Sequence, residues 1–448
     1  MLVARRLRTP LVIGLCGAAV AFDGYDLVVY GTTVSALMDE WGIGPAEAGR
    51  LASSALVGML LGSLLAGSLA DRLGRRRTLI GGLTAFSLLT AACAAAQNPD
   101  TFMVLRFLTG LGLGAVLPAA TALTIEYAPA HRRNLTYMAM QSGYAVGGIL
   151  ASALAIGLVE DAGWRVMYVI GAAPLVLVVP LALRYLPESV EHLVGRGRLD
   201  EARALAARLG RTVPEPPPST GHAGVRALFT GGLARRTLLF WTAAFAALLL
   251  VYGMNTWLPE LMREAGYPLG SALSFLLVFN LGSIVGSLLA GRLADRVGST
   301  YVVVGAFALG ALCVALLSVR GPVALTYVLV AVSGFGAIGT MNMLNAHVTR
   351  SYPVPARATG IGWSLGVGRL GGILGPSVGG LLLASDAGIG WSFALFAAVA
   401  AVGAVAVSLA PPAPRAAATR PTTEPTADRP APAGTAHEAR CPTARTAE

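Results

Sequence analysis

The octapeptide Gly67-Ser-Leu-Ala-Asp-Arg-Leu-Gly74 returns later in the chain as Gly291-Arg-Leu-Ala-Asp-Arg-Val-Gly298. The two aspartates are 295 − 71 = 224 positions apart, and the same offset relates Arg133 to Arg357. Chance does not keep one offset across separate segments, so the sequence predicts two related halves. Each half then carries an acidic and basic loop after its second helix.

The composition places both halves in a membrane. Of 448 residues, 55% are hydrophobic and 12% are charged, and the mean hydropathy is +0.67. Soluble domains carry about 25% charged residues. Apolar runs of about 20 residues, the length that crosses a bilayer, recur along the chain. They predict an all-α membrane protein with twelve transmembrane helices near residues 11–37, 47–70, 78–97, 101–127, 134–158, 165–186, 236–259, 269–291, 300–319, 322–349, 356–384 and 390–410.

All 33 basic residues are arginine, and the net charge is +10. With the N-terminus in the cytoplasm, the inner segments hold most of these arginines. The outer loops hold only Arg50, Arg165, Arg263 and Arg320, beside several acids. This pattern follows the positive-inside rule and predicts a multi-pass inner-membrane protein with both termini in the cytoplasm. The basic residues therefore indicate orientation, and we expect no nucleic-acid partner.

The composition also divides the chain into four expected parts. These are a six-helix half over 1–187, a cytoplasmic central loop over 188–232, a second six-helix half over 233–410 and a disordered tail over 411–448. The apolar spacing within the loop predicts a short amphipathic helix over 198–209, before a proline-rich linker. Residues 5–22 also fit a signal peptide, but the helix continues through Asp26 to Leu37, which favours an attached first helix.

Four charges lie deep inside predicted helices, where each costs at least about 2.5–3.5 kcal/mol. They are Asp23, Asp26, Arg106 and Arg369, and the repeat offset gives none of them a charged counterpart. The aspartates share one helix face, which Tyr30 continues. Two carboxylates this close do not both ionise easily in a low dielectric, so the pair is a candidate proton carrier. The alternative is that either aspartate braces a neighbouring helix.

The two deep arginines require anions. Arg106 lies at a depth close to that of Asp26, so it can pair with Asp26 in the empty protein or take a substrate carboxylate. Arg369, near mid-membrane, is the second candidate for the carboxylate, or an interhelical brace.

Weaker signals come from other polar and aromatic residues of the helices. Glu126 can relay a proton or pair with Arg132 or Arg133. Asn280 and Gln141 can hydrogen-bond a ring substituent or simply join helices. Four aromatic residues can stack on a ring, although such residues more often serve packing: Tyr25, Tyr144, Phe279 and Trp363.

The repeated loops suggest movement between the halves. We expect Asp71 to meet the start of the eleventh helix, where Arg357 lies, and Asp295 to meet the start of the fifth, with Arg133. These two latches would hold an outward-open state and break as the halves rock. The gating set also includes Gly67, Arg72, Gly74, Arg75 and Arg296.

The residues quoted above resemble those of a known family. Gly67–Arg77 is similar to the best-known loop motif of the major facilitator superfamily. Asp23-Gly24-Tyr25-Asp26 resembles a first-helix motif of its aromatic acid:proton symporter family. Further similarity lies in Arg106–Pro118, Asn255–Pro259 and Arg357–Arg369. Arg165 and Thr300 depart from that family's pattern, because histidines are expected there.

The resemblance implies twelve helices in two pseudo-symmetric halves that work by alternating access. It implies proton-coupled import of a small aromatic carboxylate such as benzoate or hydroxybenzoate, by a monomer without cofactor or metal. Alternatives are another organic acid (nicotinate, shikimate or muconate) or a drug:proton antiporter. Antiporters often carry a Gly-Pro-x-x-Gly-Gly element in helix five, whereas here Gly375-Pro376 lies in helix eleven. An enzyme is disfavoured, since the loops show no catalytic or metal-binding constellation.

Overall fold

The computed structural model describes residues 2–129, 132–209, 224–230, 232–385 and 388–411, and helices are the regular structure of these ranges. The predicted linker over 214–218 lies outside the described residues, as does nearly all of the predicted tail.

The first half consists of five long helices and one interrupted crossing. The long helices are α1 (Leu2–Trp41), α2 (Pro45–Leu73), α3 (Arg75–Cys93), α4 (Pro99–Tyr127) and α5 (Arg133–Ala162). The sixth crossing is divided into α6 (Arg165–Gly171), α7 (Pro174–Leu177) and α8 (Val179–Tyr185). Pro174 and Pro180 lie in the first turns of α7 and α8, where a missing backbone N–H is tolerated.

The second half also has six crossings, and it follows a connecting segment. That segment holds α9 (Val190–Gly195), α10 (Leu199–Leu209) and the 3-10 turn η2 (Val225–Phe229). The following helices are α11 (Ala234–Glu264), α12 (Leu269–Val297), α13 (Ser299–Leu316), α14 (Val323–Gly334), α15 (Thr340–Ser351), α16 (Val354–Leu383) and α17 (Ile389–Ser408). A π-helical turn, η3 (Phe335–Gly339), joins α14 to α15 in one crossing.

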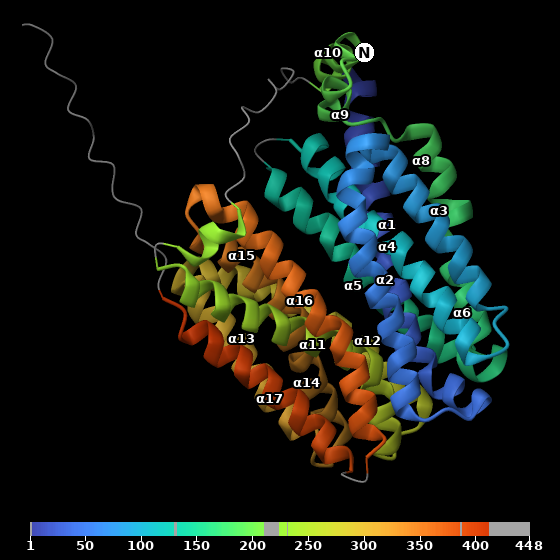
Figure 1. Cartoon of the computed structure of the whole chain (residues 1–448). Coiled ribbons are helices and arrows are strands. Elements are labelled where there is room, and N and C mark those ends of the chain that lie inside the picture. Colours follow the sequence, from blue (N-terminus) through green and yellow to red (C-terminus); the bar gives the residue numbers. More distant parts are fainter. Residues whose placement is uncertain (1, 130–131, 210–223, 231, 386–387, 412–448) are drawn as a thin grey trace, which may run out of the picture. The chain divides into compact units, whose positions relative to one another are not determined.

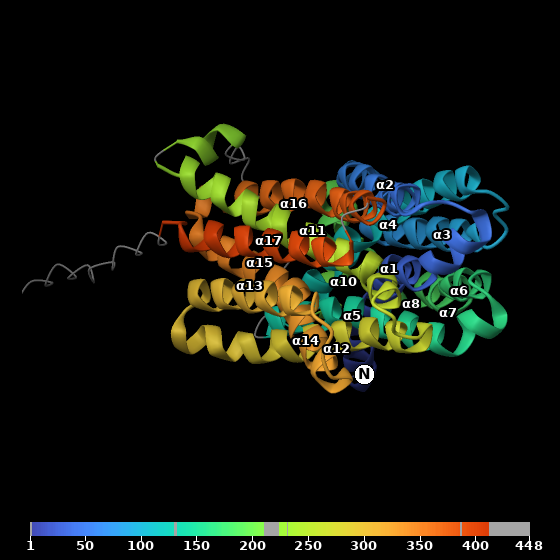
Figure 2. The same cartoon turned by 90° about the horizontal axis from the view of Figure 1, so that it is seen from below.

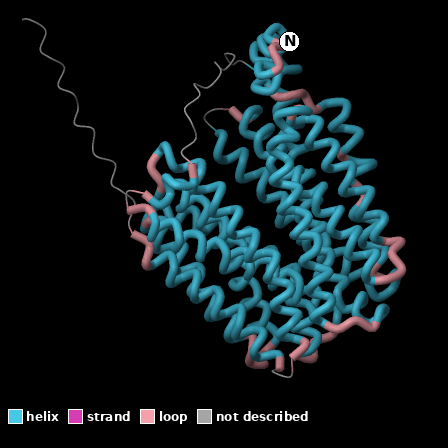
Figure 3. Tube along the Cα trace, viewed as in Figure 1, coloured by secondary structure: helices cyan, strands magenta, loops and turns pink. Residues whose placement is uncertain are grey.

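The helices confirm the predicted twelve crossings. Within the described ranges, eleven helical segments are long and apolar enough to span a bilayer. The twelfth is α3, which begins with three arginines (Arg75–Arg77) and lies against α4 and α6. Figures 1 and 2 show the helices of each half grouped together, and Figure 3 shows that most loops lie at the ends of the helices.

The repeated octapeptides adopt matching backbone conformations. Gly74 and Gly298 each lie between the second and third helix of their half, and each has φ of 97°. Such a positive φ favours glycine, because it has no Cβ. The repeat therefore preserves a sharp helix-to-helix turn that only glycine makes easily.

The halves meet along the helix ends that lie away from these octapeptides. A Cβ built on Gly31 of α1 would overlap the backbone oxygen of Asn255 on α11. One on Gly49 of α2 would come within 2.6 Å of the Pro376 oxygen on α16. At the octapeptide end, large apolar side chains such as Leu64 of α2 are exposed. Close glycine contacts therefore close one end of the interface between the halves.

Replacing Gly31 with valine is expected to force this end apart, because the side chain would overlap the α11 backbone. Nitroxide labels at Asp100 and Val323, one at this end of each half, should then show a longer distance by double electron–electron resonance. Gly157→Val in α5 is the matched control, since nothing lies within 4 Å of a Cβ there. Equal label distances in both variants would contradict the close approach.

Candidate functional site

A buried ion pair joins α1 to α4. Arg106 Nη1 donates to Asp26 Oδ2 at 2.8 Å, and the side chains are 1% and 0% exposed. Asp26 Oδ1 also accepts from the Thr90 hydroxyl of α3 at 3.1 Å. Each oxygen of the carboxylate therefore has one side-chain donor. Of the two arrangements expected for Arg106, the structure contains the pair with Asp26.

Aromatic rings enclose this ion pair. The Arg106 guanidinium carbon lies 5.8 Å from the centroid of the Tyr30 ring and 6.0 Å from that of Tyr168. The Tyr30 hydroxyl donates to the Ala48 carbonyl of α2 at 2.6 Å, so this ring is fixed in place. The Arg106 side chain is therefore buried among residues of the first half.

Asp23 has a different environment, although it is only three residues away. Its side chain is buried, and its Oδ1 has no hydrogen-bond partner among the described residues. Leu27, one turn beyond Asp23 on α1, packs in one apolar cluster with Ile373, one turn beyond Arg369 on α16. Tyr144 of α5 and Tyr252 of α11 belong to the same cluster. Asp23 therefore lies close to the second half, whereas Asp26 is bound inside the first.

An apolar cluster lies beside Arg369 and is built from both halves. Arg369 Nη1 donates to the Met59 carbonyl of α2 at 3.1 Å. The cluster joins residues of α1, α2, α5, α11 and α16, namely Leu27, Leu56, Met59, Tyr144, Tyr252 and Ile373. The buried Tyr144 hydroxyl has no partner within the described ranges. Such a set can hold an aromatic ring on its apolar members and a carboxylate on the arginine.

Two asparagines extend the polar lining toward the closed end. Asn280 of α12 donates to the Leu276 carbonyl at 3.0 Å and to Asn255 Oδ1 at 3.4 Å. Its own Oδ1 is buried without a partner in the described part of the chain. A Cβ on Gly148 of α5 would come within 2.7 Å of that oxygen. Asn280 thus presents a free acceptor where the halves touch.

Tyr25 and Trp363 lie outside this group of residues. The Tyr25 hydroxyl donates to the Met167 carbonyl of α6 at 2.8 Å, inside the first half. Trp363 is 44% exposed, and its ring stacks on Trp241 with centroids 5.6 Å apart. Their proposed stacking on a substrate stays a prediction.

Sequence reasoning missed Tyr252, Thr90 and Met59. Tyr252 looks like an ordinary apolar-face residue of its helix, and Met59 takes part through its backbone carbonyl. The repeat offset of 224 positions identified charged residues that have no charged counterpart in the other half. It does not indicate which neutral residues lie beside them.

Glu126 binds a partner other than those expected. Arg75 Nη1 donates to its Oε2 at 3.2 Å, and the backbone N–H groups of Val190 and Glu191 donate to Oε1. The carboxylate therefore ties the end of α4 to the α2–α3 loop and to the start of α9. A favourable charge at a helix start explains the second contact.

The expected latch between the octapeptide loop and α16 is not closed. Asp71 and Arg72 are exposed, and no hydrogen bond or ion pair joins Asp71 to Arg357 within the described ranges. Arg133 and Arg296 are exposed too, and the Asp295 side chain lies outside the described residues. A Cβ built on Gly67 would meet no atom within 4 Å, so this glycine leaves open space beside α2. The gating roles of these residues stay predictions.

A polar network instead joins the halves at the opposite end. Arg263 of α11 pairs with Asp39 of α1 at 3.2 Å and with Glu260 at 3.0 Å. The Ser35 hydroxyl of α1 donates to Glu260. On α2, the Ser53 hydroxyl donates to the Ile373 carbonyl at 2.6 Å. These bonds close the end at which the glycines also allow close contact.

Comparisons with known proteins identify the family of this chain. A model of the family described as Major Facilitator Superfamily matches residues 16–376 and, in a second match, 277–440. This chain belongs to that superfamily. It is 38% identical to a benzoate transport protein of Acinetobacter baylyi over 413 residues, covering 89% of this chain and 88% of the relative. It is 37% identical to a gentisate transporter of Corynebacterium glutamicum, covering 87% and 85%.

Solved structures of the superfamily share the fold. The xylose transporter of E. coli, in a partially occluded inward-open conformation, matches with a TM-score of 0.72 at 18% identity, covering 90% of this chain and all of that one. The predicted fold of two six-helix halves is thereby confirmed. The family and these relatives are transporters, not enzymes.

Removing one member of the buried ion pair should destabilise this superfamily member strongly. Asp26→Asn leaves the Arg106 guanidinium without its counter-charge, which costs about 3–5 kcal/mol. The measurement is the thermal unfolding of the purified protein in detergent. The double variant Asp26→Asn with Arg106→Gln should lose less, because no unpaired charge remains.

The matched control is Asp39→Asn, which removes the exposed pair with Arg263 at the end of the same helix. Exposed pairs contribute about 0–1 kcal/mol, so its melting temperature should change little. A double variant less stable than Asp26→Asn alone would show that the pair is not the source of the effect.

Proposed function

We propose that this protein is a proton-coupled symporter that imports small aromatic carboxylates of the benzoate and hydroxybenzoate class. The observation that carries the proposal is Arg369 of the second half, whose hydrogen bond to the Met59 carbonyl places it beside an apolar cluster built from both halves. Leu27 of that cluster lies one turn from Asp23 on α1. The names of the relatives, transporters of benzoate and gentisate, support the same substrate class.

The substrate carboxylate binds Arg369 in this proposal. A guanidinium presents two parallel N–H groups that match the two oxygens of a carboxylate. Among the described residues, Arg369 donates one hydrogen bond, to the neutral carbonyl of Met59. The ring then packs against Leu27, Met59 and Tyr252. Arg106 is the weaker candidate for the carboxylate, because Asp26 and the surrounding rings already enclose it.

Asp23 carries the proton. A bound carboxylate beside an ionised Asp23 would place two negative charges against one guanidinium in a low dielectric. Protonation of Asp23 removes that repulsion, so the proton and the anion favour each other's binding. Asp26 keeps Arg106 neutralised and positions α1 against α4.

Alternating access follows from the two ends of the interface. The distribution of arginines supports an inner-membrane protein with both termini in the cytoplasm. We propose that it works as a monomer. With that orientation, the closed end with Arg263 and Asp39 faces outward, and the open latch of Asp71 and Arg357 faces the cytoplasm. The described state is then inward-facing. Outward opening would break the Asp39–Arg263 pair and form the latches.

The first test is uptake of radiolabelled benzoate into proteoliposomes. Lowering the external pH should raise uptake, because protons enter with the substrate and Asp23 must be loaded from outside. A protonophore should abolish accumulation above the external concentration. Benzoate accumulation that persists with the protonophore would overturn proton coupling. Benzoate efflux driven by an inward proton gradient would favour an antiporter instead.

Variants of Asp23 and Arg369 separate the two roles. Asp23→Asn should abolish proton-driven accumulation while leaving benzoate exchange across the membrane, because the substrate site remains and the titrating group is lost. Arg369→Gln should lower benzoate affinity at least about tenfold, since a charge-assisted pair contributes more than about 1.4 kcal/mol. Arg235→Gln, on an exposed arginine at the start of α11, is the control and should transport normally.

Asn280 is expected to distinguish hydroxylated rings from plain ones. Its unpartnered Oδ1 can accept a hydrogen bond from a ring hydroxyl. Asn280→Leu should therefore weaken binding of hydroxybenzoates about tenfold and leave benzoate nearly unchanged. The measurement is competition of benzoate, hydroxybenzoates, gentisate, nicotinate, shikimate and muconate against radiolabelled benzoate. An equal loss for all of these acids would assign Asn280 to packing alone.

A further inference from the structure

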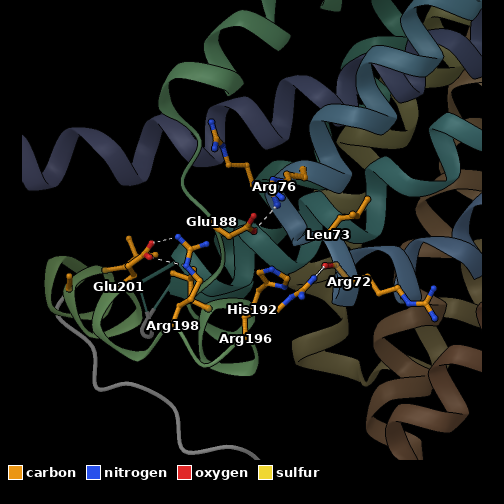
Figure 4. A pocket seen from close by; sticks show the side chains of 12 residues that line it. Arg72, Leu73, Arg76, Glu188, His192, Arg196, Arg198 and Glu201 are labelled. Carbon is orange, nitrogen blue, oxygen red and sulfur yellow. Dashed lines mark hydrogen bonds and ion pairs between the residues drawn. The ribbon is translucent and has the colours of Figure 1, made fainter.

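A cavity lies outside the membrane-spanning helices, between the α2–α3 loop and the segment that carries α9 and α10 (Figure 4). Its volume is about 790 Å³. Five arginines and two glutamates line it, which leaves a surplus of three positive charges when His192 is neutral. It is separate from the substrate site, and its residues take no part in the transport cycle proposed above, Arg72 excepted.

Both glutamates of this cavity are already engaged. Glu188 Oε1 accepts the backbone N–H groups of Arg76 and Ser189, each at 3.0 Å. Glu201 pairs with Arg198 at 2.6 Å, and Figure 4 shows this pair at one side of the cavity. Neither carboxylate neutralises the remaining arginines.

Four arginines there have no carboxylate partner within the described ranges. Arg76 Nη2 donates to the Leu183 carbonyl, and Arg196 Nη2 donates to the Arg72 carbonyl. The side chains of Arg72 and Arg77 make no hydrogen bond to another described residue. Neutral carbonyls orient guanidinium groups but do not cancel their charge. Gathering like charges around one cavity costs energy that a bound anion would recover.

We propose that this cavity binds a phosphate-bearing polyanion. Phosphate groups place several negative charges in a small volume, and guanidinium forks bind them bidentately. The cavity accommodates more than one phosphate. The same chemistry belongs to a phosphorylated molecule free in solution and to the headgroup of an anionic phospholipid, because the site lies next to the ends of α2 and α3.

Binding there would join two separate parts of the chain. Arg76 and Arg77 belong to α3, directly after the octapeptide loop, whereas Arg196 and Arg198 lie between α9 and α10. A polyanion bound by both pairs of arginines would hold the segment with α9 and α10 against the end of α2 that carries Asp71. The ligand would thereby change how readily this end of α2 moves to form the latch with the start of α16. This inference goes beyond the proposed function and does not depend on the substrate.

The experiment uses the full chain in phosphatidylcholine nanodiscs, with inorganic pyrophosphate as the probe. Thermal unfolding should show saturable stabilisation by pyrophosphate that weakens at high salt. The double variant Arg77→Gln with Arg196→Gln removes one guanidinium from each part of the chain, and should weaken binding at least about tenfold. Arg235→Gln with Arg292→Gln is the matched control, because it removes two exposed arginines near the same end of the second half.

A second arm separates the two sources of phosphate. Nanodiscs containing phosphatidylglycerol replace the neutral ones, without pyrophosphate. Stabilisation by the anionic lipid that the double variant loses and the control keeps would assign the site to a headgroup. Stabilisation by pyrophosphate with the same pattern would assign it to a soluble ligand. The absence of both effects, or equal loss in the variant and the control, would overturn the proposal.

Glu201→Gln is a second variant that tests the proposal if the arginine double variant does not fold. This change frees Arg198 from its partner and adds to the surplus of positive charge. Pyrophosphate or phosphatidylglycerol, whichever binds the wild type, should then bind several-fold more tightly. Unchanged or weaker binding would count against the cavity as the site.

Discussion

The buried pair of Asp26 and Arg106 is the constraint on which the first half depends. A guanidinium in the hydrocarbon region requires an anion at bonding distance, and the structure supplies one at 2.8 Å with a threonine hydroxyl on the other oxygen. Meeting that demand fixes the positions of α1, α3 and α4 relative to one another. The aromatic rings of Tyr30 and Tyr168 then pack around a charge that is already neutralised.

The two aspartates of α1 consequently differ in purpose despite their spacing. Asp26 is bound within its own half, whereas Asp23 has one oxygen with no hydrogen-bond partner among the described residues and lies one turn from Leu27, which packs against the second half. A carboxylate with a partner on each oxygen is expected to keep those partners during a transport cycle. An unsatisfied one beside Arg369 responds to any anion that arrives. Of these two deep acids, the one at the interface between the halves is therefore the one that is free to act.

Much of this architecture could be predicted from the sequence, because hydropathy and the repeated octapeptide depend on local patterns. Twelve crossings follow from runs of apolar residues, and the Asp26–Arg106 pair follows from the cost of charge at that depth. Tyr252 and the contact of Arg369 with the Met59 carbonyl could not be predicted, since they depend on how two halves pack. Glu126 illustrates the same limit, because its partner Arg75 comes from a different loop than its neighbours in sequence.

The exclusive use of arginine as the basic residue has a chemical consequence. A guanidinium stays protonated throughout the physiological range, so every cation of this protein other than histidine or the chain terminus is a fixed charge. Changes in net charge between neutral and mildly acidic conditions therefore come from carboxylates and the five histidines. The same composition leaves no lysine amine for acylation, so amine-directed reagents find no side-chain target in this protein.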